Sequence, residues 1–203
     1  MPRYVGRENV RKRLEPLQGR PGRTTYADGA VRIETADETI TVRPPFGLAH
    51  ARVYEHIELG PLIEELARDH VVAAVLVRLG GFAVGLFDGE RLVVSKVGSR
   101  FVKGRHKKGG SSANRFRRRR EEQERALLQA AAETAERILD PYRDRVERVA
   151  LGGDRAAAAR VVERLPWLEE KALPRFFTVP DPRQRELERL PYELYAAELT
   201  EEP

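Results

Sequence analysis

Residues 71–97, which read VVAAVLVRLGGFAVGLFDGERLVVSKV, decide the fold. Two dipeptides, Gly80-Gly81 and Asp88-Gly89, divide this stretch, and both tolerate the positive φ that tight hairpin turns require. The segments on either side of them predict three antiparallel strands in a meander, at 71–79, 82–87 and 91–97. Because residues 71–77 are all apolar, we expect their strand to be central in the sheet.

Downstream of the meander the apolar residues recur with helical spacing. Residues 113–139 predict a long helix that Pro141 ends. Six apolar residues share one of its faces: Leu127, Leu128, Ala131, Ala135, Ile138 and Leu139. We then expect a strand at 148–154, a helix at 155–165, a strand at 175–179 and a mostly helical segment at 182–199. This order predicts an α+β (mixed α/β) fold, in which an antiparallel meander plus a β-α-β-α unit give a mixed central sheet with helices packed on it.

Upstream of the meander the pattern indicates smaller elements. Residues 7–17 have helical spacing, 30–35 and 39–43 alternate as a hairpin, and 60–70 predict a short helix with Pro61 in its first turn. We therefore divide the chain at residue 70. Residues 1–70 are expected to be an N-terminal helix and hairpin elaboration, and residues 71–203 a single compact domain.

The composition of the chain excludes several classes of protein and of functional site. Of the 203 residues 41% are hydrophobic, enough for a core, and 34% are charged. The chain has no cysteine, which excludes disulfides, thiolate zinc sites and a cysteine nucleophile. The first residues show no apolar signal region, and residues 71–77 form too short an apolar run to cross a bilayer. We expect a soluble, cytoplasmic protein with no membrane partner.

The positive charge is concentrated in one segment. The whole chain carries +5, but residues 100–120 alone hold ten basic residues and no acidic one. Such a patch indicates a polyanionic partner, most commonly a nucleic acid. The residues predicted to bind RNA are Arg100, Lys103, Arg105, His106, Lys107, Lys108, Arg115, Arg117, Arg118, Arg119 and Arg120. Only Phe101 and Phe116 are aromatic here, which favours contacts to the RNA backbone over base stacking.

In the middle of this basic segment stands Gly109-Gly110-Ser111-Ser112. Adjacent glycines let a backbone enter a narrow space and expose its amides. His106 lies beside them without a second histidine or a nearby acid, so a nuclease is poorly supported and a phosphate-facing role is favoured. His50, His56 and His70 match no metal-ligand spacing, so no metal site is predicted.

The run from Gly109 to Arg120 resembles the Gly-Gly-Gln loop and following helix of the eukaryotic and archaeal class I peptide-chain release factors. With Ser99-Arg100-Phe101-Val102 and Glu121-Glu122-Gln123 around it, the segment is more similar still to the Vms-like branch, which has actinobacterial members and contains release-factor-like peptidyl-tRNA hydrolases. The resemblance implies a release-factor catalytic-domain-like fold for residues 71–203. It also implies hydrolysis of the peptidyl-tRNA ester on stalled ribosomes or large subunits, as part of translation quality control.

The site that this resemblance implies is Gly109, Gly110, Ser111 and Ser112, with peptidyl-tRNA and the rRNA of the large ribosomal subunit as partners. It implies neither a cofactor nor a metal, and we expect a monomer. Where the release factors have glutamine, this chain has Ser111, and the first glutamine after it is Gln123. Three readings are open. Ser111 or Ser112 holds the water that attacks the ester, or Gln123 takes the place of the missing glutamine, or the chain binds peptidyl-tRNA without cleaving it. The alternatives are thus a non-catalytic ribosome- or tRNA-binding factor, or a tRNA 3′-end nuclease.

Overall fold

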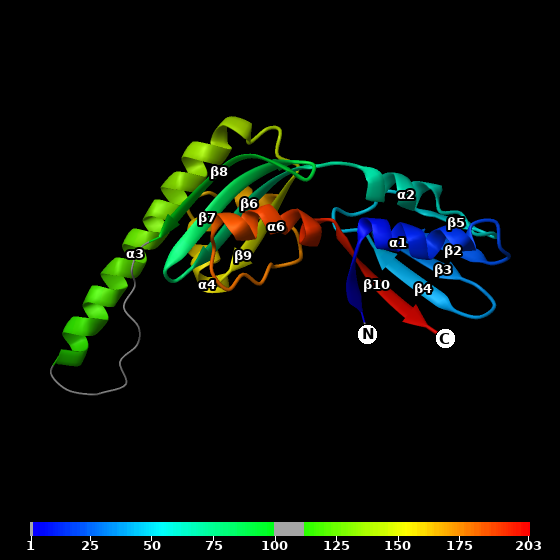
Figure 1. The fold of residues 1–203 in the computed structure, drawn as a ribbon, viewed down its shortest axis with the longest axis horizontal. Helices are drawn as coiled ribbons and strands as arrows, with labels where there is room; N and C mark the ends of the chain where they lie inside the picture. Colours follow the sequence, from blue (N-terminus) through cyan, green and yellow to red (C-terminus); the bar gives the residue numbers. More distant parts are fainter. Residues whose placement is uncertain (1, 100–111) are drawn as a thin grey trace. The chain divides into compact units, whose positions relative to one another are not determined.

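The chain folds into two compact units. The structure is a computed structural model that describes residues 2–99 and 112–203 (Figure 1). Contacts group Met1–Asp69 with Leu190–Pro203 in the first unit, and His70–Arg189 form the second. This division differs from the one expected from the sequence, because the last fourteen residues join the N-terminal segment and not residues 71–189.

The first unit is a six-stranded antiparallel sheet with the strand order β1-β10-β4-β3-β2-β5. Alternate residues such as Val31, Ile33, Ile40 and Val42 are fully buried, because helices cover this face of the sheet. The elements are β1 (Arg3–Gly6), α1 (Arg7–Leu14), η1 (Glu15–Leu17), β2 (Arg23–Ala27), β3 (Ala30–Glu34), β4 (Thr39–Arg43), β5 (Arg52–Tyr54), α2 (Gly60–Ala67) and β10 (Ala196–Glu202).

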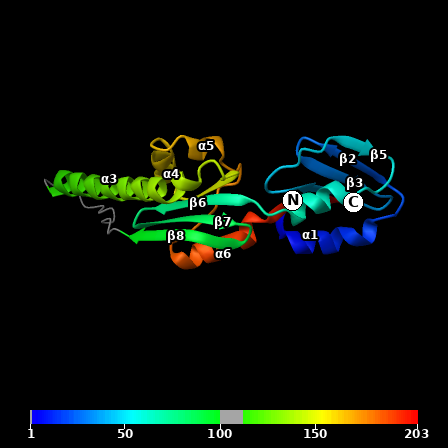
Figure 2. The same cartoon turned by 90° about the horizontal axis from the view of Figure 1, so that it is seen from above.

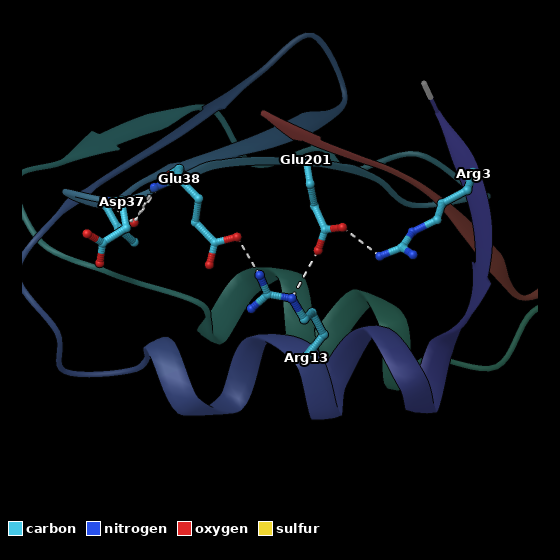
Figure 3. A network of polar contacts seen from close by, with 6 residues as sticks. Arg3, Arg13, Asp37, Glu38 and Glu201 are labelled. Atoms are coloured by element: carbon cyan, nitrogen blue, oxygen red, sulfur yellow. Dashed lines mark hydrogen bonds and ion pairs between the residues drawn. The ribbon is translucent and has the colours of Figure 1, made fainter. Parts of the chain in front are cut away.

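A polar network fastens α1 to this sheet (Figure 3). The guanidinium of Arg13 donates to the carboxylates of Glu38, beside β4, and of Glu201 on β10, the latter at 3.0 Å. Glu201 also accepts from Arg3 on β1, at 2.6 Å. The hydrogen bond to Glu38 and the neighbouring carboxylates raise the pKa of Arg13 above its ordinary value. The C-terminal strand is therefore held to the first unit by side chains as well as by its ladder.

The second unit is built on a four-stranded sheet with the order β8-β7-β6-β9. β6 to β8 form the predicted meander, and β9 pairs parallel to β6, so the sheet is mixed as expected. The elements are β6 (Val71–Arg78), β7 (Gly81–Asp88), β8 (Arg91–Ser99), α3 (Ser112–Leu139), η2 (Asp140–Tyr142), β9 (Arg148–Gly153), α4 (Arg155–Val162) and α5 (Trp167–Glu170). Helix α6 (Gln184–Leu194) begins in this unit and ends in the first.

The strand register brings four strand ends together at one end of this sheet. Val77 pairs with Gly153, Arg78 with Gly81, and Gly81 with Ser99. We call the end of the sheet at Arg78, Gly81, Ser99 and Gly153 the exit end, because the chain leaves it from Ser99 towards the basic segment. The basic segment is thus tethered to a fixed place on the sheet.

Helix α3 packs on the sheet by its C-terminal half. Leu127, Ala131, Ala135 and Leu139 are fully buried against β6, β7, β8 and α4. The helix ends beside the start of β6, where the amide of Glu147 donates to the carbonyl of Val71. Its N-terminal half therefore points towards the exit end, and Figure 2 shows α3 running along the strands.

The lengths of helix and sheet set how far α3 extends past the exit end. The 28 residues of α3 span about 42 Å at 1.5 Å per residue. The eight residues of β6 span about 26 Å at 3.3 Å per residue. The difference of about 16 Å corresponds to roughly eleven helical residues. We call residues 112–122 the arm, and Figure 1 shows it beyond the strands of its own unit.

Two expectations from the sequence are wrong, and three strands were missed. Residues 175–179 are no strand: Phe177 makes only an isolated bridge to Gly152, because the flanking residues Pro174 and Pro180 cannot donate to a ladder. The helix expected over 182–199 stops at Leu194, and Ala196–Glu202 is strand β10, paired on both sides. Strands β1, β2 and β5 were not expected at all.

Candidate RNA-binding site

Much of the predicted site lies outside the described residues. These are Arg100, Lys103, Arg105, His106, Lys107, Lys108, Gly109, Gly110 and Ser111. Ser112 is the first residue of α3. The predicted RNA-binding residues that the structure places are the arginines of the arm, at 115 and 117–120.

One face of the arm is basic and concave. Arg115, Arg118 and Arg119 are exposed and lie three or four residues apart, so they share a face of the helix. Together with Asn114 and Glu122 they line a shallow hollow that is open to solvent. Three guanidinium groups around one hollow favour an anion with several oxygens, such as a phosphate.

The other two arginines of the arm have different surroundings. Arg117 is paired with Glu121 one turn later, with 3.8 Å between Nε and Oε1. Arg120 is half-buried and lies on the packed side, seven residues before Leu127. Its Nε is buried and has no hydrogen-bond partner in the described part of the chain. The structure therefore divides the predicted arginine run into three arginines on one open face and two others, of which Arg117 is paired with Glu121 and Arg120 is half-buried.

The basic arm is electrostatically unfavourable in the free protein. Its first turn contains no acidic residue, so the arginines stand near the positive end of the helix dipole without compensation. Arg115 also repels Arg118 and Arg119 at three- and four-residue spacing. Each effect costs a few tenths of a kcal/mol at an exposed position. A surface with this excess of positive charge favours the binding of a charged ligand.

Helix α3 is anchored firmly at its other end. Past Leu139 the chain turns through η2, and the indole Nε1 of Trp167 donates to Asp140 at 3.2 Å. The imidazole Nδ1 of His70 lies 2.9 Å from a carboxylate oxygen of Glu147. The buried half of α3 and these contacts hold the arm in a set direction from its own sheet.

The histidines that might have suggested metal chemistry are dispersed. His50 contacts the hydroxyl of Tyr54 at 3.0 Å, and His56 lies 3.8 Å from Glu58. His70 belongs to the other unit. Across residues 2–99 and 112–203, no group of three histidine, aspartate or glutamate side chains is placed to hold a metal ion. Over the same residues, no helix is both long and apolar enough to span a membrane.

Sequence reasoning missed a second group of basic residues. Arg78, Arg155 and Arg175 come from three separate segments, whose backbones are hydrogen-bonded to one another at the exit end. The only signal in the sequence is that Arg78 and Arg155 stand at the boundaries of predicted elements, which is too common a position to single them out.

The second unit thus joins a mixed four-stranded sheet to a helix with a basic start, and Gly109-Gly110 come shortly before that helix in the sequence. Residues 70–200 match the family model described as Actinobacteria/chloroflexi VLRF1 release factor. The match covers more than half of the chain, and the chain belongs to this family. The resemblance expected from the sequence is confirmed.

The chain is also similar to individual proteins. The chain is 28% identical over 154 residues to peptide chain release factor subunit 1 of Archaeoglobus fulgidus, which covers 73% of this chain and 38% of that protein. The crystal structure of the archaeal translation termination factor aRF1 aligns with 93% of this chain and 54% of its own, at 19% identity and a TM-score of 0.46. A structure named only as an archaeal protein aligns with 90% of this chain and 51% of its own, at 19% identity and a TM-score of 0.43. The chain thus spans about two fifths to one half of these relatives.

Proposed function

We propose that this protein is a ribosome-associated peptidyl-tRNA hydrolase that releases nascent chains from stalled ribosomes or large subunits. The observation that carries the proposal is the arm, a basic helix end fixed in direction by its buried C-terminal half. The diglycine Gly109-Gly110 comes two residues before this helix in the sequence. The ester that joins a peptide to tRNA lies among RNA phosphates, and a cationic arm with a narrow tip suits that setting.

The chemistry needs no strong base. The backbone amides at Gly109 and Gly110 stabilise the negative charge that develops on the ester oxygen, and a polar side chain positions the attacking water. The serines at 111 and 112 are the polar groups nearest to the diglycine in sequence. In this proposal a serine hydroxyl holds the water where the related release factors use the longer glutamine amide.

A release assay tests the proposal. Isolated large subunits that carry labelled peptidyl-tRNA are mixed with the protein, and the free peptide is measured over time. We expect the wild type to release the peptide. We expect Gly110→Ala to reduce the rate by at least about tenfold, because a Cβ at the tip obstructs the approach and each 1.4 kcal/mol of lost stabilisation costs a factor of ten.

Ser111→Gln separates the enzyme from the second candidate, a binding factor without catalysis. The substitution of glutamine by Ser111 is the observation that favours this second candidate. If the wild type releases nothing and only Ser111→Gln gains activity, the protein is a binding factor. A matched control is Ser99→Gln, at the last residue of β8, which leaves the diglycine unchanged.

A further inference from the structure

The exit end of the second unit's sheet collects three arginines besides those of the arm. The amide of Asp154 donates to the carbonyl of Val77 at 2.7 Å, and the amide of Gly153 donates to that of Phe177 at 2.9 Å. These two bonds place the end of β6, the start of α4 and residues 175–178 side by side. Arg78, Arg155 and Arg175 therefore gather where the chain departs towards the basic segment; we call them the sheet-end arginines.

Aromatic rings and a carbonyl fix the directions of these side chains. The guanidinium of Arg155 lies over the ring of Phe176, 4.4 Å from its centre, and that of Arg175 lies over Phe177 at 4.9 Å. Arg78 donates from Nη1 to the carbonyl of Val179 at 3.3 Å. A guanidinium stacked on a ring still presents its N–H groups around its rim, so it can receive a planar, bidentate acceptor.

Two of the sheet-end arginines, Arg78 and Arg155, have no carboxylate partner among the described residues. In the described parts of the chain neither Arg78 nor Arg155 forms an ion pair, and both are exposed. The nearest carboxylate in sequence, that of Asp154, accepts from the amide of Ala157 at 2.9 Å as the cap of α4. The carboxylate of Asp181 is paired with Arg183 at 2.5 Å. A positive surface therefore remains open at the exit end.

We propose that the sheet-end arginines are a second phosphate-binding surface, which contacts the same RNA as the arm but from another side. The arm extends about 16 Å beyond the exit end, so an RNA strand that lies against Arg115, Arg118 and Arg119 meets the sheet at its base. All three residues are arginine and none is lysine, which favours bidentate contacts to phosphate oxygens, and their place beside the basic arm favours RNA as the partner. This inference rests on the proposed function. If the protein hydrolyses peptidyl-tRNA, the RNA that it contacts is the acceptor end of that tRNA.

The inference is tested by RNA binding, which is separate from peptide release. The probe is a fluorescent RNA hairpin with the sequence of a tRNA acceptor stem, and anisotropy gives its affinity between 50 and 200 mM salt. For the double variant Arg78→Gln with Arg155→Gln, two lost phosphate contacts reduce the logarithmic salt slope by about 1.6. The wild type should then lose about ninefold more affinity than the variant over this range. The variant with lysine at both positions should recover most of the slope.

The control removes the same charge from the opposite end of the sheet. Arg137→Gln with Arg145→Gln changes two exposed arginines and should leave the wild-type slope. If Arg78→Gln disturbs folding through its bond to Val179, the single variant Arg155→Gln, with half of the effect, replaces the double one. The inference is overturned if the sheet-end variant and the control variant both keep the wild-type salt slope. It is also overturned if polyglutamate displaces the RNA from the wild type but not from the sheet-end variant. Peptide release that fails while the slope changes refutes only the proposed hydrolase.

Discussion

Removing the charge of the arm should weaken RNA binding in a way that depends on salt. The variant is Arg115→Gln with Arg118→Gln and Arg119→Gln, which clears the three exposed guanidinium groups around the hollow. Each phosphate contact contributes about 0.8 to the logarithmic salt slope, so three contacts contribute about 2.4. Over a fourfold increase in salt, the wild type should lose about 30-fold more affinity than the variant. Anisotropy with the acceptor-stem hairpin measures both slopes.

The control must remove three charges elsewhere on the same unit. Arg91, Arg137 and Arg145 are exposed and lie towards the opposite end of the sheet, where Arg91 pairs with Asp88 and Asp88 with Val71. Their change to glutamine lowers the net charge equally but should leave the slope within about 0.5 of the wild type. Equal slopes for the arm variant and this control would refute the reasoning, because the binding would then follow net charge and not the arm.

Three further predictions concern the packing of the two units, and thermal unfolding tests the first two. Leu127→Ala should cost about 2–5 kcal/mol, because the side chain is fully buried where α3 meets the sheet, and an unchanged melting temperature would contradict this packing. Gly153→Ala should cost more than about 2 kcal/mol, because φ is +95° and a Cβ would stand 2.2 Å from the carbonyl oxygen of Val77; a cost below about 1 kcal/mol would refute that geometry. Burial raises the pKa of Tyr26 well above its ordinary value of 10.0. The contribution of Tyr26 to the free energy of unfolding is therefore complete below pH 10 and falls as the pH rises above 10. Tyr26→Phe removes the hydrogen bond to the carbonyl of Glu58 and should therefore lower the free energy of unfolding by about 1 kcal/mol at pH 7. Above pH 10 the variant should lose stability less steeply than the wild type. An equally steep decline would count against a neutral, buried phenol.

The meander was predictable because its signals are local. Gly80-Gly81 and Asp88-Gly89 fix the turns, and the apolar runs between them are too regular to be misread. The long helix was equally clear, since its apolar stripe starts at Leu127 and the structure buries that stripe. In these segments propensity, periodicity and tertiary packing agree.

The C-terminal strand was not predictable by the same means. Ala196-Ala197-Glu198-Leu199 consists of good helix formers, and only pairing with β1 and β4 makes it a strand. The partners are remote in sequence: Leu199 lies opposite both Arg3 and Val42. The discontinuous first unit follows from this pairing, so its boundary could not be found from local patterns.

The candidate site was predictable in part. The arginine run and the diglycine stand out by composition, and their role at the site stays a prediction. The sequence did not indicate that the arm's arginines divide into an open face and two locally engaged side chains, because that depends on which side of α3 meets the sheet. The sheet-end arginines required the strand register as well.

The position of the arm on the RNA is the central claim, and tethered cleavage tests it most directly. The chain has no cysteine, so Asn114→Cys gives a single attachment point on the arm for an iron chelate that produces hydroxyl radicals. On large subunits that carry peptidyl-tRNA, we expect the chelate at residue 114 to cut the acceptor end of the tRNA and the rRNA around it. The same chelate at Glu136→Cys, on the exposed side of the anchored half of α3, should leave that end intact. Equal cleavage of the acceptor end from both positions, or none from residue 114, would contradict the account.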